Sequence, residues 1–248
     1  MTFKLLSYNI RYGGAGRESQ LASVIREADP DLVVLQEATD PRVVERLSEE
    51  TGLGHRAAHR GHSIAYLSRV GVKRHEWHRP RGSRRHFMEI ELEGSDLVVF
   101  GIHLSAVHSF WTERRRMREL RSLLAWVATR GKGFHVMVGD FNTLAPGELL
   151  DARKLPPRLR ALVWLSGGRV NYRTIQILLA AGYADSFRRL HPGDAGYTFP
   201  TWEPHVRLDF VFIPREHEAR VTDCRVLAGG APVEEASDHF PLLAAIET

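Results

Sequence analysis

The sequence has almost no cysteine and no long apolar run, and both absences exclude classes of protein. Cys224 is the only cysteine among 248 residues, so an internal disulfide is excluded and a reducing compartment is expected. No apolar stretch is long enough for a membrane-spanning helix. The first residues, 3–6, are strand-like and are not a basic stretch followed by an apolar one. A secretory signal is therefore not expected, and the expected location is cytoplasmic.

Features that separate domains are also missing. The sequence contains no Ser/Gly-rich spacer, no low-complexity tract and no repeat of about 20–50 residues. Its length and its 43% hydrophobic content allow a sizeable core, which could belong to one large α/β domain or to two small ones. Because no linker is visible, we expect a single domain over residues 1–248.

Lysine is scarce, and nearly all the positive charge is carried by arginine. The net charge of +4 favours polyanionic partners such as nucleic acid or an anionic lipid surface. Basic residues concentrate in two segments, 73–85 and 153–160. Genome base composition alone can produce a bias toward arginine, so charge by itself does not identify the partner.

Hydrophobic periodicity predicts a chain of alternating strands and helices. Strands are expected at 3–8, 31–37, 61–69, 86–93, 96–103, 134–140, 207–213 and 242–246. Helices are expected at 18–28, from Pro41 onward, at 112–129 with Thr112 as N-cap, and at 174–181. For the polar and basic segment 75–86 we expect a connecting loop.

Polar side chains stand where several of these strands end. Asp140 and Asn142 follow the apolar segment 134–138 and Gly139, while Asn9 and Glu37 end the first two strands. A lone Gly-Asp-x-Asn segment is usually a turn, because Asp and Asn side chains bond to nearby backbone groups. Several such segments in one chain instead predict a site built from strand ends.

The ordered set of segments resembles the endonuclease/exonuclease/phosphatase superfamily of metal-dependent phosphoesterases. The matching segments, in family order, are Ser-Tyr-Asn at 7–9, Leu-Gln-Glu at 35–37, His103, Gly-Asp-Phe-Asn at 139–142, Arg-Leu-Asp at 207–209 and Ser-Asp-His at 237–239. The resemblance implies a four-layer α/β sandwich, in which two stacked mixed β-sheets are flanked by helices. The chain departs from a minimal family member at about 144–171, where we expect an insertion that is either a lid or substrate wall, or a cover for the sheet edge.

The resemblance assigns an expected role to each matching residue. For a Mg²⁺ or Mn²⁺ cofactor it implies the ligands Asn9, Glu37 and Asp238, all of which carry oxygen donors. Arg11 is an expected phosphate contact. The expected catalytic residues are Asp140, Asn142, His239, His103 and Asp209. Among them, Asp140 and Asn142 would position or activate water, the histidines would bind phosphate and move protons, and Asp209 would orient His239.

The substrate is left open by these motifs, because the superfamily cleaves DNA, RNA, phosphoinositides and sphingomyelin from nearly the same core. A histidine at position 103 is typical of the deoxyribonuclease and sphingomyelinase branches. We expect a phosphodiester, with nucleic acid ahead of phospholipid, since Phe110, Trp111 and Trp164 could stack on bases or enter a lipid surface. An inactive binding scaffold is the alternative from another class, and the presence of every expected acidic and amide residue argues against it.

Overall fold

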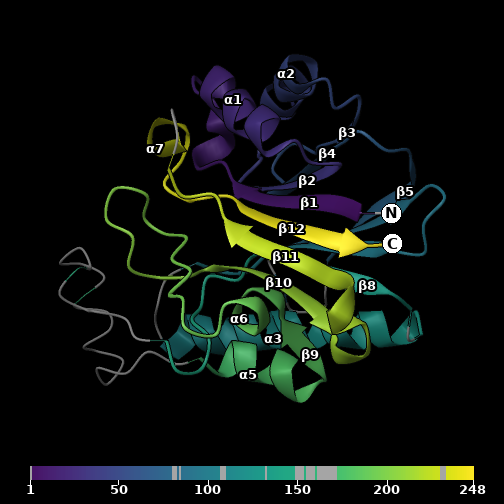
Figure 1. Ribbon diagram of the computed structural model, residues 1–248, viewed down its shortest axis with the longest axis vertical. Helices are drawn as coiled ribbons and strands as arrows, with labels where there is room; N and C mark the ends of the chain where they lie inside the picture. Colours follow the sequence, from purple (N-terminus) through teal and green to yellow (C-terminus); the bar gives the residue numbers. More distant parts are fainter. Residues whose placement is uncertain are drawn as a thin grey trace.

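The computed structural model describes residues 2–79, 83, 85–106, 110–131, 133–148, 154, 160, 172–229 and 233–248 (Figure 1). Most of the expected insertion at 144–171, including Trp164, lies outside these residues. The side chain of Phe110 and most of the basic segment 153–160 also lie outside them.

Two six-stranded sheets form the centre of the molecule. The first sheet has the order β11-β12-β1-β2-β4-β3, and its strands in chain order are Thr2–Asn9, Leu32–Gln36, His55–Ala57, Ile64–Ser68, Val221–Val226 and Leu242–Glu247. The second has the order β5-β6-β7-β8-β10-β9, and its strands in chain order are Val72–His78, Phe87–Leu92, Val98–His103, His135–Asp140, Tyr183–Asp185 and Asp209–Pro214. Both sheets are mixed, because β1–β2 and β7–β8 are parallel while the other pairs are antiparallel.

Helices cover the outer face of each sheet. The helices α1 (Glu18–Ala28), α2 (Pro41–Thr51) and α7 (Val233–Ala236) lie on the first sheet, and α3 (Phe110–Thr129) and α5 (Arg173–Ala180) lie on the second (Figure 1). The short helix α6 (Ser186–Leu190) follows β9, and the 3₁₀ turns η1 (Tyr12–Gly14) and η3 (Arg215–Arg220) complete the elements within the described residues. Within the described residues, no helix has the length and hydropathy that crossing a membrane requires.

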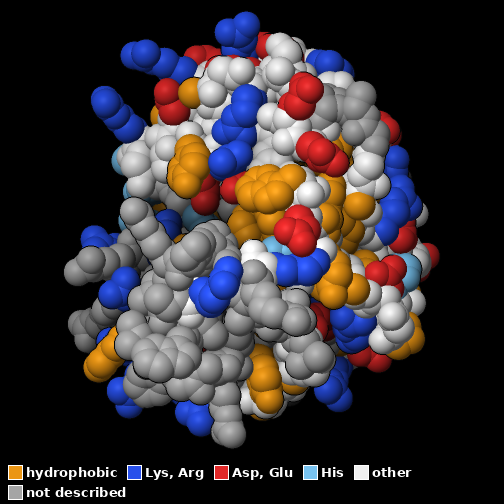
Figure 2. Space-filling view, turned by 90° about the vertical axis from the view of Figure 1, so that its left-hand side faces the viewer, with side chains coloured by type: hydrophobic (Ala, Val, Ile, Leu, Met, Phe, Trp, Pro, Cys, Tyr) orange, Lys and Arg blue, Asp and Glu red, His pale blue; other side chains and the backbone are white. Residues whose placement is uncertain are grey.

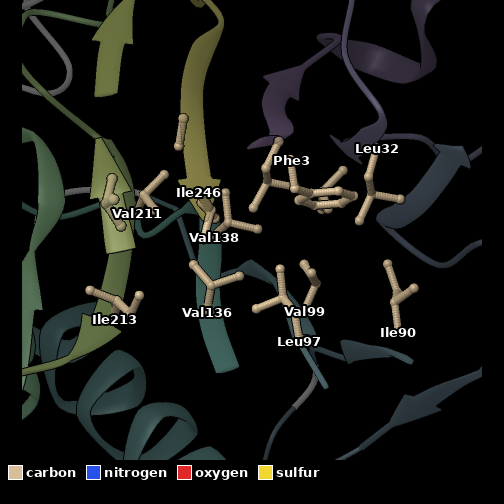
Figure 3. Packing of buried hydrophobic residues seen from close by; sticks show 14 of the residues in the cluster. Phe3, Leu32, Ile90, Leu97, Val99, Val136, Val138, Val211, Ile213 and Ile246 are labelled. Carbon is tan, nitrogen blue, oxygen red and sulfur yellow. The ribbon is translucent and has the colours of Figure 1, made fainter. Parts of the chain in front are cut away.

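The two sheets face each other across one large apolar cluster. Alternate residues of a strand point to opposite faces, so Leu5 packs between the sheets while Leu6 packs under the helices. Figure 3 shows Val136 and Val138 of the second sheet in the same cluster as Phe3 of the first. The helices, two sheets and helices make four layers, which confirms the expected α/β sandwich.

Two details of the expected secondary structure are wrong. Part of the segment 75–86 is not a loop but the end of β5, an edge strand that pairs only with β6. Its exposed positions, such as Lys73 and His75, are polar, so an edge strand of this kind has no continuous apolar signal. In addition, α3 begins at Phe110, which places Thr112 inside the first turn and not at the N-cap.

Candidate active site

Strand pairing brings the expected site residues to one end of both sheets. The parallel register of β7 and β8 pairs His103 with Asp140, and the antiparallel register of β8 and β10 pairs Asp140 with Asp209. In the first sheet, the parallel strands β1 and β2 pair Asn9 with the residue before Glu37. These positions therefore meet where β1 ends, on the left in Figure 1.

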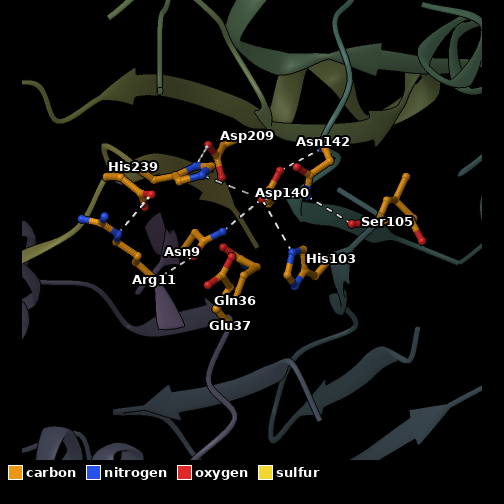
Figure 4. Close-up of polar contacts among 12 residues, drawn as sticks. Asn9, Arg11, Gln36, Glu37, His103, Ser105, Asp140, Asn142, Asp209 and His239 are labelled. Atoms are coloured by element: carbon orange, nitrogen blue, oxygen red, sulfur yellow. Dashed lines mark hydrogen bonds and ion pairs between the residues drawn. The ribbon is translucent and has the colours of Figure 1, made fainter. Parts of the chain in front are cut away.

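Asp140 is the centre of this group (Figure 4). Its carboxylate is 1% exposed and accepts hydrogen bonds from the Asn9 side-chain amide at 3.0 Å and from the Asn142 backbone N–H at 2.8 Å. The Asn142 side-chain amide donates a further bond at 3.0 Å. The Nε2 atoms of His103 and His239 lie 3.8 Å and 4.0 Å from the carboxylate oxygen Oδ2. Burial raises the pKa of Asp140, while the positive charge of His239 opposes the rise.

The backbone at the end of β8 has an unusual conformation that positions the Asp140 and Asn142 side chains. Gly139 has φ 144°, and a Cβ atom there would lie 1.9 Å from the backbone oxygen of Ile102, so only glycine fits. Asn142 has φ 52°, a left-handed conformation that Asn tolerates better than most residues. Its side-chain amide also donates to the Leu104 carbonyl at 3.1 Å, which fixes the amide beside β7.

His239 is held in one orientation by a carboxylate. Its Nδ1–H donates to Asp209 Oδ2 at 2.8 Å, and its ring lies 4.8 Å from the Phe199 ring centroid. Burial lowers the pKa of His239, but the carboxylates of Asp209, Asp140 and Asp238 outweigh burial and raise it to about 9. The geometry thus presents an imidazolium whose Nε2–H points toward Asp140.

His103, unlike His239, has a lowered pKa and is neutral. The ring is 3% exposed, and burial together with the positive charges of Arg85 and His239 lowers its pKa to about 3. Its Nδ1 is buried and has no hydrogen-bond partner in the described part of the chain. The other ring nitrogen, Nε2, is the one that faces Asp140, so this is the atom through which His103 takes part in the site.

Glu37 and Asn9 form the side of the site contributed by the first sheet. Glu37 has φ 58°, and its Oε2 accepts the Tyr12 backbone N–H at 2.6 Å. The Asn9 side-chain oxygen accepts the Arg11 backbone N–H at 3.0 Å. Asp238 faces the same loop, with its Oδ2 3.4 Å from Arg11 Nε. The structure therefore brings together all nine residues that the sequence motifs single out.

The donors on this side suit a hard divalent cation. Glu37 and Asn9 offer oxygen atoms only, and no group of three or more His, Cys, Asp or Glu side chains in the described ranges is arranged to hold a metal. The described residues therefore do not form a closed zinc site. Mg²⁺ is commonly bound by one or two carboxylates and completes its shell with water and substrate oxygens, which fits Glu37 with Asn9.

Two residues to which the sequence analysis assigns no role connect the walls of the site. The Ser237 hydroxyl donates to the Asn9 backbone oxygen at 2.6 Å. The Arg17 guanidinium donates to the backbone oxygens of Ile10 and Ala236, which joins the loop after β1 to the end of α7. Ser237 stands inside a recognised motif, whereas no sequence signal marks Arg17.

Helix α3 supports the second sheet's side of the site through buried charges. Arg116 is 1% exposed, contacts Glu113 at 2.9 Å and donates to the Ser105 backbone oxygen at 2.8 Å. Glu119 accepts the Ser105 hydroxyl at 2.8 Å, and Glu113 accepts the Thr143 hydroxyl at 3.3 Å. These bonds hold the loops that follow β7 and β8, which carry the groups around Asp140.

Three solved structures of similar fold are named as a phosphatase, an endonuclease and an exonuclease. A 3′ phosphatase from Neisseria, bound to a product DNA hairpin, is 18% identical with a TM-score of 0.74. An AP endonuclease from Archaeoglobus fulgidus is 18% identical with a TM-score of 0.76, and a 3′-5′ exonuclease from Neisseria meningitidis is 19% identical with a TM-score of 0.72. Each comparison covers 99% of this chain and 100% of the other. At such low identity these likenesses show the fold alone.

The family itself follows from the sequence. No curated protein matches the chain significantly. The model of the Endonuclease/Exonuclease/phosphatase family matches residues 6–239, a range that contains every residue of the site. The chain therefore belongs to the Endonuclease/Exonuclease/phosphatase family and is a phosphoric ester hydrolase.

Proposed function

We propose that this protein hydrolyses phosphodiester bonds in nucleic acid with the help of Mg²⁺ or Mn²⁺. The observation that carries the proposal is the buried Asp140 carboxylate, which is hydrogen-bonded to Asn9 and Asn142 and is faced by two histidines, His103 neutral and His239 cationic. Such a cluster supplies both a proton acceptor and a cationic donor beside one reaction centre.

The proposed chemistry assigns one task to each group. A divalent cation held by Glu37 and Asn9 would neutralise charge on the phosphate oxygens. Asp140 orients the attacking water and accepts its proton, and Asn142 keeps the carboxylate in place. As the water oxygen bonds to phosphorus, the bond from phosphorus to the leaving oxygen breaks, and the His239 imidazolium gives its Nε2 proton to that leaving oxygen while Asp209 fixes the ring. His103, kept neutral by burial, contributes a hydrogen bond to the phosphate.

Support for a nucleic-acid substrate comes from the relatives and from charge. The Neisseria 3′ phosphatase is bound to a product DNA hairpin, the other two neighbours are named as an endonuclease and an exonuclease, and this chain is basic, with a net charge of +4. A phospholipid diester is the second candidate, because Trp111 is 75% exposed and could enter a lipid surface. The single cysteine, buried and unpaired, is compatible with the proposed cytoplasmic location.

A substrate panel tests the proposal at matched metal and salt. It contains single- and double-stranded DNA, RNA, sphingomyelin vesicles, phosphoinositides, bis-p-nitrophenyl phosphate and p-nitrophenyl phosphate. We expect turnover of DNA or RNA, and a loss of about a hundredfold or more in kcat for Asp140→Asn and for His239→Ala.

Asp96→Asn is the matched control, because Asp96 is an exposed acid in the β6–β7 turn, at the opposite end of the sheet. It should turn over substrate like the wild type. Turnover of lipids or of the monoester alone, with DNA and RNA untouched at low salt, would reject the nucleic-acid substrate. Full activity of His239→Ala would reject the site.

A further inference from the structure

Two aromatic side chains stand exposed at the mouth of the site. Tyr12 is 82% exposed and Trp202 is 60% exposed. The guanidinium carbon of Arg11 lies 5.6 Å from the Tyr12 ring centroid and 5.9 Å from the Trp202 ring centroid. Figure 2 shows this end of the molecule, where exposed hydrophobic side chains lie among basic and acidic ones. We call Tyr12, Arg11 and Trp202 the aromatic clamp.

The N-terminal part of the aromatic clamp is attached directly to the site. The backbone N–H of Tyr12 donates to Glu37, and that of Arg11 donates to Asn9. Arg11 and Tyr12 have φ values of 49° and 48°, which residues other than glycine rarely adopt. Such a conformation persists only where the surroundings enforce it, and it commonly occurs at functional sites.

The Trp202 side of the clamp is anchored to the opposite wall. Thr201 donates its backbone N–H to the Asp238 carbonyl at 3.0 Å and its hydroxyl to the Ser237 carbonyl at 3.0 Å. The Phe199 ring lies 6.4 Å from the Trp202 ring and 4.8 Å from the His239 ring. The two exposed rings are therefore fixed on either wall of the same site.

The chemistry of the clamp suits a nucleotide better than an acyl chain. Its two rings are not a continuous apolar patch, because the cation of Arg11 lies near both and is paired with Asp238. Exposed aromatic and guanidinium planes stack on nucleobases, and a guanidinium also attracts phosphate. In an intact duplex both faces of an internal base are already covered, so a ring of the clamp can stack only on an unpaired or terminal base.

We propose that the aromatic clamp is a stacking subsite for an unpaired nucleobase beside the scissile phosphate, so that single-stranded or frayed ends are preferred over intact duplex. The proposal rests on the proposed nucleic-acid hydrolysis and adds the strand state of the substrate. Tyr12 and Trp202 act on binding and selection, while the groups around Asp140 carry out the chemistry.

The test compares kcat and KM for a single-stranded oligonucleotide, the same sequence in a blunt duplex, and bis-p-nitrophenyl phosphate. For Trp202→Ala and Tyr12→Ala we expect KM for the single strand to rise about tenfold, since one stacked base commonly contributes that much or more. The kcat values should stay within about twofold of the wild-type value, and turnover of bis-p-nitrophenyl phosphate should not change. Trp202→Phe should keep most of the wild-type affinity for the single strand. Tyr172→Ala removes an exposed aromatic side chain at the start of α5 and should behave as wild type.

Different outcomes separate failure of the clamp from failure of the proposed function. If the wild type cleaves oligonucleotides and both alanine variants keep its KM and its strand preference, the clamp is rejected and the function stands. If the wild type cleaves bis-p-nitrophenyl phosphate but no oligonucleotide, the function and the clamp both fail. If Trp202→Ala loses binding to anionic phospholipid vesicles and keeps its oligonucleotide KM, the surface is a membrane contact and the clamp is overturned.

Discussion

At the scale of single residues, the end of β8 leaves no room for a side chain at Gly139. A Cβ atom at Gly139 would lie 1.9 Å from a backbone oxygen of β7, and φ is 144° there. Gly139→Ala is expected to lower the free energy of unfolding by about 3 kcal/mol or more, because neither strand can move without breaking the ladder. Chemical denaturation measures this value. Gly133→Ala, where a Cβ meets nothing within 4 Å, is the control and should change little.

The Asp209 carboxylate gives a second prediction at residue scale. Asp209→Asn keeps the shape of the side chain but removes the charge that bonds to His239 Nδ1 at 2.8 Å. The imidazolium then loses its main stabilising partner, and kcat for bis-p-nitrophenyl phosphate should fall about a hundredfold or more. KM should change much less, because the ring remains in place.

Asp223→Asn is the matched control for that variant, since Asp223 pairs with Arg225 on the surface of β11. Its kcat should equal that of the wild type. A kcat for Asp209→Asn within a few fold of the wild type would show that the Asp209–His239 pair does not contribute to the reaction.

At the scale of elements, one buried carboxylate joins two strands and a helix. Glu89 on β6 is 2% exposed and contacts His78 of β5 at 2.8 Å. It also accepts the indole N–H of Trp126 of α3 at 3.0 Å and pairs at 3.0 Å with Arg130, which directly follows that helix. Burial raises the pKa of Glu89, but the Trp126 bond and the nearby positive charges prevail and lower it below its usual 4.5.

This lowered pKa predicts how stability depends on pH. A carboxyl group with a lower pKa in the folded state stabilises the fold above its ordinary pKa, and the contribution disappears as pH falls through the lowered value. Glu89→Gln should therefore cost about 3 kcal/mol at pH 7 and progressively less below pH 4.5. Denaturation at several pH values measures the difference. A constant difference from pH 7 to pH 3 would contradict the prediction, and Glu76→Gln, at an exposed position of β5, should show almost none.

The arrangement of elements was predictable where polar residues end apolar strands and was missed where strands are short or polar. Asn9, Asp140 and His103 stand at strand ends in the sequence. Parallel pairing places His103 beside Asp140, and the stacking of the two sheets then brings Asn9 to the same end. The edge strand β5 has a polar surface, and β9 has only three residues, so neither has a periodic signal.

Helix packing decided the role of a charged residue that the sequence left ambiguous. Three consecutive arginines, 114–116, cannot share one direction on a helix, and only the phase of α3 against β7 and β8 decides which one is buried. Arg116 turns inward and binds the Ser105 carbonyl, whereas Arg114 is exposed. Such tertiary choices depend on the partner element, which local periodicity does not contain.

At the scale of the whole molecule, the proposed cation site is separate from the apolar clusters that stabilise the fold. The clusters between the sheets and under the helices contain only hydrophobic side chains, whereas Glu37 and Asn9 lie where strands end. Stability and metal binding should therefore be nearly independent, unlike in small domains whose folding requires the metal.

Metal removal tests this separation. We expect EDTA to abolish hydrolysis of bis-p-nitrophenyl phosphate and excess Mg²⁺ or Mn²⁺ to restore it, because the donors at the site are oxygen atoms. The Tm should fall by only a few degrees in EDTA, since one weakly bound cation contributes little to the folded state. Glu37→Gln should need more Mg²⁺ for half-maximal activity and should keep the wild-type Tm in EDTA. Glu45→Gln is the control, because Glu45 lies on the exposed side of α2, and it should keep the wild-type Mg²⁺ requirement. Full activity in EDTA would contradict the assignment of Glu37 and Asn9 to a catalytic cation. Unfolding on chelation would contradict the inference that this cation does not serve folding.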